Sequence, residues 1–209
     1  MFGFIKSLFS KQNIIPEEKD PMKKFLIVGL GNIGDEYAET RHNIGFKILD
    51  EVAKTNDFTF ETVKLGDIGS YKIKGRTIIC LKPSTYMNRS GKALKYWMDK
   101  ENIPQSNVLV ITDDINLPFG TIRIKTKGSN GGHNGLKDVE FFLQTILYNR
   151  YRFGVGADFG QGRQVEYVLG QWNDEEKALL PERLKKSTEI INSFALAGIA
   201  RTMNQYNNS

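Results

Sequence analysis

Short, uninterrupted apolar runs are the feature that most constrains the fold of this 209-residue chain. The segments FLIVG at 25–29 and VLVI at 108–111 contain no charged or polar side chain. Strands of that composition are typical of a sheet that is buried on both faces by helices. The two runs therefore predict buried strands of an α/β fold.

Other segments predict further strands of the same sheet. Segments 70–73 and 77–81 are strand-like and flank the turn KGR at 74–76, so they predict a β-hairpin. Additional strands are expected at 121–125, where apolar and polar residues alternate, and at 151–156. A hairpin together with strands that alternate with helices indicates a mixed sheet.

Helical patterns occupy much of the remaining chain. Ser84 is a candidate N-cap, and Pro181 is expected to interrupt the last pattern and to open a second helix at its first turn. The helical stretches are 44–54, 84 to about 100, 136–147 and 174 to about 206. The chain therefore predicts a single α/β domain in which helices surround a mixed β-sheet.

The first 22 residues differ from the rest of the chain. Residues 1–10 are rich in aromatic side chains, whereas 11–22 are polar and contain Pro16 and Pro21. The segment lacks the small-residue cleavage site of a secretory signal. Residues 1–22 are therefore expected to be an N-terminal extension that is flexible or partly helical, and the folded domain is expected to cover 23–209.

Composition limits the classes of partner and cofactor. Lysine and arginine total 29 against 24 aspartate and glutamate, and the net charge of +5 permits an anionic partner without requiring one. Cys80, the single cysteine, lies in an apolar run and is expected to be buried. No Cys/His cluster has zinc spacing, and no apolar run approaches the roughly 18 residues of a membrane span. We expect a reduced, cytoplasmic protein without a metal.

The sequence GLGNIG at 29–34 matches the G-x-G-x-x-G pattern of dinucleotide-binding folds. That motif needs a helix that begins at the glycines and binds pyrophosphate with its N-terminus. Here the segment 35–41 intervenes and includes Asp35 and Glu36, which would repel phosphate. A nucleotide-dependent enzyme is therefore a disfavoured alternative, and the glycines are expected to form a sharp turn that presents Asn32.

The chain contains two histidines, His42 and His133, and asparagine follows each of them. Histidine titrates near neutral pH, with an unperturbed pKa of about 6.5, so imidazole acid–base chemistry must use one of these two. Both lie among glycine, asparagine and arginine rather than in apolar runs. We interpret His42 as functional because several polar residues surround it, whereas the pattern at His133 fits a loop and a site equally well.

Asp113 follows the apolar run at 108–111 and is expected to emerge at the carboxyl end of that strand, an edge where α/β proteins build sites. Its carboxylate can bind one ring nitrogen of His42 and leave the other free as a base, as in hydrolases. The chain has no G-x-S-x-G motif and its cysteine lies in a strand, so water is the expected nucleophile. Several asparagine amides can hold a carbonyl, a peptide group or the attacking water.

Four sequence motifs, which follow one another along the chain, resemble those of a known family. They are FLIVGLGNIGDEYAETRHNIGF, KPSTYMNRSGKA, DDINLPFG and GSNGGHNGLKD. Together they resemble bacterial peptidyl-tRNA hydrolase from about Lys23 to the C-terminal helical region. The resemblance implies a single α/β domain that hydrolyses the ester between a peptide and tRNA, uses no metal or cofactor, and acts in the cytoplasm as a monomer.

The resemblance also implies roles in catalysis for individual residues. His42 matches the general base of the family, Asp113 the carboxylate that orients it, and Asn32 the asparagine beside the catalytic water. Asn134 matches an asparagine that positions substrate and water. His133 aligns with a family histidine in a supporting role.

Other matches concern substrate binding. Asn88 and the backbone of Met87 resemble the group that holds the peptide, and Tyr37 resembles the aromatic residue that meets the 3′-terminal nucleotide. Lys125 and Arg152 match the clamp on the tRNA 5′-phosphate. Phosphate contacts of this kind give affinity that does not depend on sequence.

Two positions depart from the family pattern. Ile33 stands where the family usually has proline, and Asn116 stands where it often has an acidic residue. Neither position matches the base or its carboxylate. The alternative function is that of a non-catalytic RNA-binding relative with the same fold, which the complete set of catalytic matches disfavours.

Overall fold

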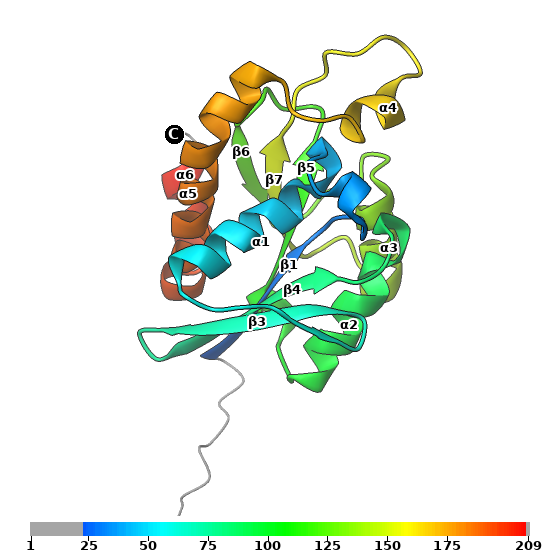
Figure 1. Ribbon diagram of the computed structural model, residues 1–209. Coiled ribbons are helices and arrows are strands. Elements are labelled where there is room, and N and C mark those ends of the chain that lie inside the picture. Colours follow the sequence, from blue (N-terminus) through cyan, green and yellow to red (C-terminus); the bar gives the residue numbers. More distant parts are fainter. Residues whose placement is uncertain (1–22, 208–209) are drawn as a thin grey trace, which may run out of the picture.

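The computed structural model describes residues 23–207, so the expected extension at 1–22 lies outside the described residues. A seven-stranded sheet lies at the centre of the domain, between layers of helices (Figure 1). Its strands are β1 (Lys24–Gly29), β2 (Glu61–Val63), β3 (Gly66–Ile73), β4 (Arg76–Pro83), β5 (Val108–Asp114), β6 (Ile122–Lys125) and β7 (Asn149–Gly154). Their order across the sheet is β2-β3-β4-β1-β5-β7-β6.

The two apolar runs form buried strands, as predicted, and the structure places these strands next to each other in the interior of the sheet. β1 pairs in parallel with β4 and β5, and β5 pairs in parallel with β7. The pairs β2–β3, β3–β4 and β6–β7 are antiparallel. The prediction of an α/β domain with a mixed sheet is therefore confirmed, and so is the burial of Cys80 on β4.

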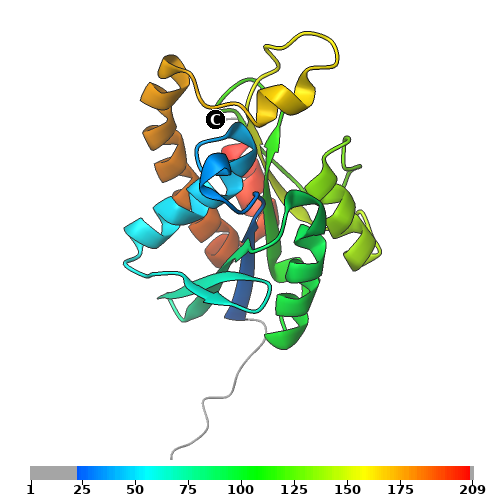
Figure 2. The ribbon, with the colours of Figure 1, turned by 45° about the vertical axis from the view of Figure 1, so that its right-hand side comes forward.

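Alternate residues of β1 face two separate hydrophobic cores. The helices are α1 (Ile44–Thr55), α2 (Ser90–Lys100), α3 (Asn134–Leu143), α4 (Gln164–Val168), α5 (Asp174–Ala197) and α6 (Ile199–Tyr206). Phe25 and Ile27 pack with residues of α1 and α5, whereas Leu26 and Val28 pack with residues of α2 and α3. The helices α1 and α5 lie on one side of the sheet, and α2 and α3 lie on the other (Figure 2). Because both faces are covered, β1 is apolar from Phe25 to Gly29. Within 23–207, no helix is long and apolar enough to cross a membrane.

Two predicted helix boundaries were wrong. Ser84 does not cap a helix: its backbone N–H donates to the carbonyl oxygen of Leu65, and α2 begins only at Ser90. α3 ends before Gln144, which adopts a left-handed conformation with φ of 54°. In addition, β2 and α4 were not predicted, because the exposed β2 and the five-residue α4 are too short to give apolar periodicity.

The expectation that Pro181 interrupts the C-terminal helical region was also wrong. Pro181 lies inside α5, which is continuous over 24 residues. An interior proline removes one helical hydrogen bond, but α5 buries Leu180, Ile190 and Phe194 in the core, and this packing stabilises the helix. The break falls at Gly198, whose φ of 83° is a conformation that glycine adopts without strain.

The end of β1 packs directly on the start of α1, and glycines allow this contact. A Cβ on Gly45 would lie 2.4 Å from the carbonyl oxygen of Leu30, and a Cβ on Gly29 would lie 2.4 Å from the carbonyl oxygen of Gly45. Side chains cannot be accommodated at such distances, so both positions require glycine. The contact brings the segment that contains Asn32 beside the turn that carries His42.

Gly45→Ala is expected to lower the free energy of unfolding by about 1–3 kcal/mol or more, because its methyl group would overlap backbone atoms. Urea denaturation followed by circular dichroism measures this change. Gly160→Ala is the control, since a Cβ there meets only the Arg163 side chain at 4.0 Å; it should change the free energy by less than about 1 kcal/mol. Equal stability of the two variants would contradict the close packing.

Candidate active site

A cavity of about 670 Å³ lies beside the carboxyl ends of β1 and β5, at the edge where parallel sheets form sites. The predicted site residues that line it are Asn32, His42, Met87, Asn88, Asp113, Lys125, His133, Asn134 and Arg152. Tyr37 does not line the cavity: it lies on a neighbouring 3₁₀ turn, η2 (Asp35–Tyr37), and is half-buried. The fold therefore brings together nearly all of the residues that the sequence singled out.

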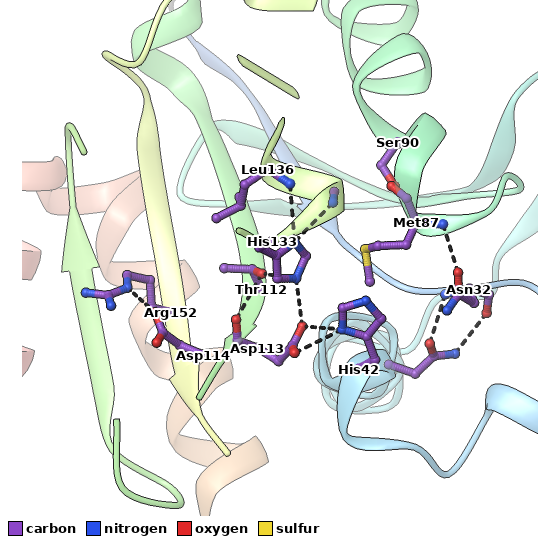
Figure 3. A network of polar contacts seen from close by, with 12 residues as sticks. Asn32, His42, Met87, Ser90, Thr112, Asp113, Asp114, His133, Leu136 and Arg152 are labelled. Atoms are coloured by element: carbon purple, nitrogen blue, oxygen red, sulfur yellow. Dashed lines mark hydrogen bonds and ion pairs between the residues drawn. The ribbon is translucent and has the colours of Figure 1, made fainter. Parts of the chain in front are cut away.

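His42 and Asp113 form a hydrogen-bonded pair in this cavity (Figure 3). His42 lies on the 3₁₀ turn η3 (Arg41–Asn43), and its Nδ1 is 2.9 Å from Oδ2 and 3.0 Å from Oδ1 of Asp113. An ionised carboxylate can only accept hydrogen bonds, so the proton of the neutral imidazole lies on Nδ1. Nε2 then carries the lone pair and is the nitrogen available as a base.

His133 approaches the same carboxylate from the start of α3. Its Nδ1 accepts the backbone N–H groups of Gly135 and Leu136 at 3.1 and 3.2 Å, which caps the helix. Its proton therefore lies on Nε2, which is 2.9 Å from Asp113 Oδ1 and 2.8 Å from Thr112 Oγ1. His133 is thus a loop residue and a member of the site at once, and it helps to hold the carboxylate that faces His42.

Burial and charge act in opposite directions on the His42–Asp113 pair. Burial raises the pKa of the Asp113 carboxyl, but the neighbouring His42 and His133 outweigh it and hold that pKa well below its usual range. Burial lowers the pKa of His42, but the Asp113 carboxylate and its hydrogen bond raise it above the ordinary 6.5. Asp113 is therefore ionised at neutral pH and stabilises the imidazolium that forms when His42 accepts a proton.

Asn32 is fixed by hydrogen bonds on both its backbone and its side chain. The side chain of Asn43 accepts from the Asn32 N–H at 2.8 Å and donates to the Asn32 carbonyl oxygen at 2.9 Å. Oδ1 of Asn32 accepts the backbone N–H of Met87 at 2.8 Å. The Asn32 Nδ2 group makes no hydrogen bond within the described chain and can donate to a ligand.

Met87, Asn88 and Asn134, three of the residues expected to contact substrate, differ in which of their atoms are free to bind a ligand. Met87 is buried; its N–H donates to Asn32, and its carbonyl oxygen accepts from Ser90 Oγ at 2.9 Å. Its backbone is therefore occupied, and the thioether is the part that remains for a ligand. Asn88 and Asn134 are exposed, and across residues 23–207 their side-chain amides have no hydrogen-bond partner.

One wall of the cavity comes from α4 and the residue that follows it, which the sequence did not indicate. The lining residues there are Gln164, Val165, Val168 and Leu169. Arg41, beside His42, anchors this region: it forms a buried ion pair with Glu176 at 2.7 Å, and its guanidinium lies 4.5 Å from the centroid of the Tyr167 ring. A five-residue helix gives no recognisable pattern, so only tertiary structure reveals this wall.

Among the described residues, one group could offer three ligands to a metal ion: His42, Asp113 and His133, with ligand atoms within 4.8 Å of one another. Both histidines already hydrogen-bond to Asp113, and the second nitrogen of His133 accepts backbone N–H groups. A cation would have to displace these bonds. The donor set therefore fits a hydrogen-bonded network better than a coordination site.

A histidine oriented by a buried carboxylate, with amide groups nearby, is typical of hydrolases. In the described part of the chain, no serine or cysteine hydrogen-bonds to His42, so the site fits activation of water rather than of a side-chain nucleophile. The fold and the site together indicate the class of protein, a hydrolase built on an α/β domain.

Comparison with known proteins identifies the family. Residues 26–209 match the family model described as Peptidyl-tRNA hydrolase. The peptidyl-tRNA hydrolases of Bacteroides fragilis and Porphyromonas gingivalis are 56% and 53% identical over 184 residues, which is 88% of this chain and 98% and 100% of theirs. A crystal structure of peptidyl-tRNA hydrolase from Acinetobacter baumannii has a TM-score of 0.83 at 33% identity and covers 89% of this chain and 95% of its own. This chain belongs to the peptidyl-tRNA hydrolase family.

The pKa of His42 is expected to depend on Asp113. An NMR titration should give a value above 6.5 in the wild type, because Asp113 stabilises the charged ring. Asp113→Asn removes that charge but leaves the ring buried, so the pKa should fall below 6.5. The chain has two histidines, so the spectrum of His42→Ala assigns the signals. The same pKa with and without Asp113 would show that this carboxylate does not control the charge of His42.

Proposed function

We propose that this protein cleaves the ester between peptide and tRNA in peptidyl-tRNA, with His42 as the general base. Membership of the family supplies the reaction, an ester hydrolysis that releases tRNA. The assignment of the base rests on the His42–Asp113 pair, in which the carboxylate holds Nδ1 and leaves Nε2 free. His133 has no equivalent free nitrogen, because Nδ1 accepts two backbone N–H groups and Nε2 faces Asp113 and Thr112.

The proposed reaction contains two proton transfers. Nε2 of His42 takes a proton from water while the water oxygen attacks the ester carbonyl carbon, which gives a tetrahedral intermediate. The bond to the terminal ribose oxygen then breaks, and the imidazolium returns the proton to that oxygen. Asp113 remains ionised and stabilises the imidazolium between the two transfers. One water is consumed, and the products are the free peptide and tRNA.

Asparagine amides are proposed to position the water and the peptide. The free Nδ2 of Asn32 lies in the same cavity as His42 and is suited to hold the attacking water. Asn88 and Asn134, which are exposed to the cavity, are suited to the peptide and the ester carbonyl. An amide that binds the first peptide group would reject tRNA with a free amino acid, because that amide would be left without a partner.

Binding of tRNA is proposed to involve Lys125 and Arg152 at its phosphate, and Tyr37 at the 3′-terminal nucleotide from beside the cavity. Basic side chains that contact phosphate groups bind tRNA regardless of its base sequence, which suits an enzyme whose substrates are tRNAs of different sequence. We further propose that the protein acts in the cytoplasm as a monomer. A non-catalytic RNA-binding role is not favoured, because the base, its carboxylate and the asparagines are all present in one cavity.

His42→Ala is expected to lower kcat by about 10²–10⁴-fold and to leave tRNA affinity almost unchanged, because the base acts on water and not on the tRNA. The assay is release of the acylated amino acid from N-acetylaminoacyl-tRNA, with filter binding of uncharged tRNA beside it. Lys54→Ala, at an exposed position of α1, is the control. Near-normal turnover of His42→Ala would exclude His42 as the base.

Lys125→Ala is expected to raise KM and to reduce the salt dependence of kcat/KM. Loss of one phosphate contact should lower the slope of log(kcat/KM) against log[salt] by about 0.7–0.9. The measurement is hydrolysis of N-acetylaminoacyl-tRNA across a series of KCl concentrations, again with Lys54→Ala as the control. A slope identical to that of the wild type would contradict a phosphate contact at Lys125.

A further inference from the structure

Asp113 and Asp114 are consecutive residues at the end of β5, and their carboxylates point in different directions (Figure 3). Asp113 faces His42, whereas Asp114 faces Arg152 on the neighbouring strand β7. We propose that Asp114 is a positioning residue that fixes the Arg152 guanidinium for binding a tRNA phosphate. The inference rests on the proposed function, in which Arg152 contacts tRNA.

One face of the β6–β7 pair is basic because basic and apolar residues alternate along both strands. The register places Arg123 opposite Arg152 and Lys125 opposite Arg150, so these four side chains lie on the same face of the sheet. The intervening residues, which are buried in the core, are Ile122, Ile124, Tyr151 and Phe153. The strand period of two thus concentrates positive charge on the face opposite the core.

Two of these four cations donate to backbone carbonyl oxygens of the domain. Arg150 is buried and donates to backbone carbonyl oxygens of the loop before α3. Arg123 donates to a backbone carbonyl oxygen near the C-terminal end of the described chain. Lys125 and Arg152 donate to no backbone group in 23–207, and both line the cavity. They are therefore the cations of this face that remain for an anionic ligand.

The contact between Asp114 and Arg152 uses only part of the guanidinium. Nε of Arg152 donates to Oδ2 of Asp114, and Arg152 forms no other hydrogen bond or ion pair with the described residues. Its two terminal nitrogens remain available to a ligand. Asp114 is itself oriented, because its Oδ1 accepts the backbone N–H of Asn116 at 2.8 Å. The side chains of Asp114 and Arg152 are only 11% and 18% exposed, so water screens their attraction weakly.

A carboxylate beside an arginine has two opposing effects on phosphate binding. It neutralises part of the positive charge, which weakens attraction to an anion. It also restrains a flexible side chain before the ligand arrives, and a planar guanidinium must be aligned to bind phosphate through two nitrogens. The contact at Nε leaves the opposite edge of the guanidinium facing away from Asp114. We therefore expect orientation to outweigh neutralisation at this site.

The test compares N-acetylaminoacyl-tRNA that carries either a 5′-phosphate or a 5′-hydroxyl group, with the wild type and Asp114→Asn. The amide in this variant keeps the shape of the side chain and can still accept the Asn116 N–H, but it lacks the charge that holds Arg152. Asp114→Asn should raise KM for the phosphorylated substrate by about 3- to 10-fold, with a smaller change in kcat. The preference for the 5′-phosphate should fall toward that of Arg152→Ala, and the double variant should resemble Arg152→Ala alone.

Matched variants separate positioning from a general loss of structure. Asp114→Glu keeps the carboxylate and should recover part of the phosphate preference. Asp99→Asn, at an exposed position of α2, should leave KM unchanged. An unchanged or lower KM for Asp114→Asn would overturn the inference, since it would show that Asp114 only neutralises Arg152. A wild type that cleaves both substrates equally well would overturn it too, whereas a wild type that cleaves neither would instead refute the proposed function.

Discussion

The carboxylate of Asp113, buried at the end of β5, hydrogen-bonds to two imidazoles from distant parts of the chain. Burial alone would make this charge costly, and the two histidines compensate for that cost. The arrangement also fixes both rings, because His42 must hold its proton on Nδ1 and His133 on Nε2. Since His133 caps α3, the same carboxylate joins β5, η3 and α3. The proposed base, His42, therefore depends on the Asp113 carboxylate, which also binds His133, the residue that caps α3.

The backbone around this carboxylate is held by equally specific contacts. Gly29 and Gly45 let β1 meet α1 at a distance that no other residue permits, and this contact sets the position of η3. Asn43, which follows His42, binds the backbone of Asn32, and Asn32 in turn binds the backbone N–H of Met87. Three loops are thus connected by hydrogen bonds before any substrate arrives. A site that is organised in advance needs less rearrangement in the transition state.

The sequence predicted those parts of the structure that local chemistry determines. The apolar runs predicted buried strands, and the position of Asp113 directly after one of them predicted a carboxylate at the edge of the sheet where α/β proteins build sites. Tertiary packing determined the features that the sequence did not predict. Pro181 stays helical because α5 is packed on the core, and α4 is too short to leave a pattern. The link between His133 and Asp113 depends on α3 lying beside β5, which no spacing in the sequence reveals.

The pair Asp113–Asp114 shows how one strand end can serve two tasks. Adjacent residues of a strand point to opposite sides, so one carboxylate reaches the histidines and the next reaches Arg152. The distance between Asp113, which orients the proposed base, and Arg152, the proposed phosphate contact, is then set by the paired backbones of β5 and β7 rather than by a loop. An enzyme built in this way would favour substrates whose ester and phosphate have a matching separation. The acceptor end of tRNA has a constant geometry, so this selection would recognise tRNA as a class without reading its sequence.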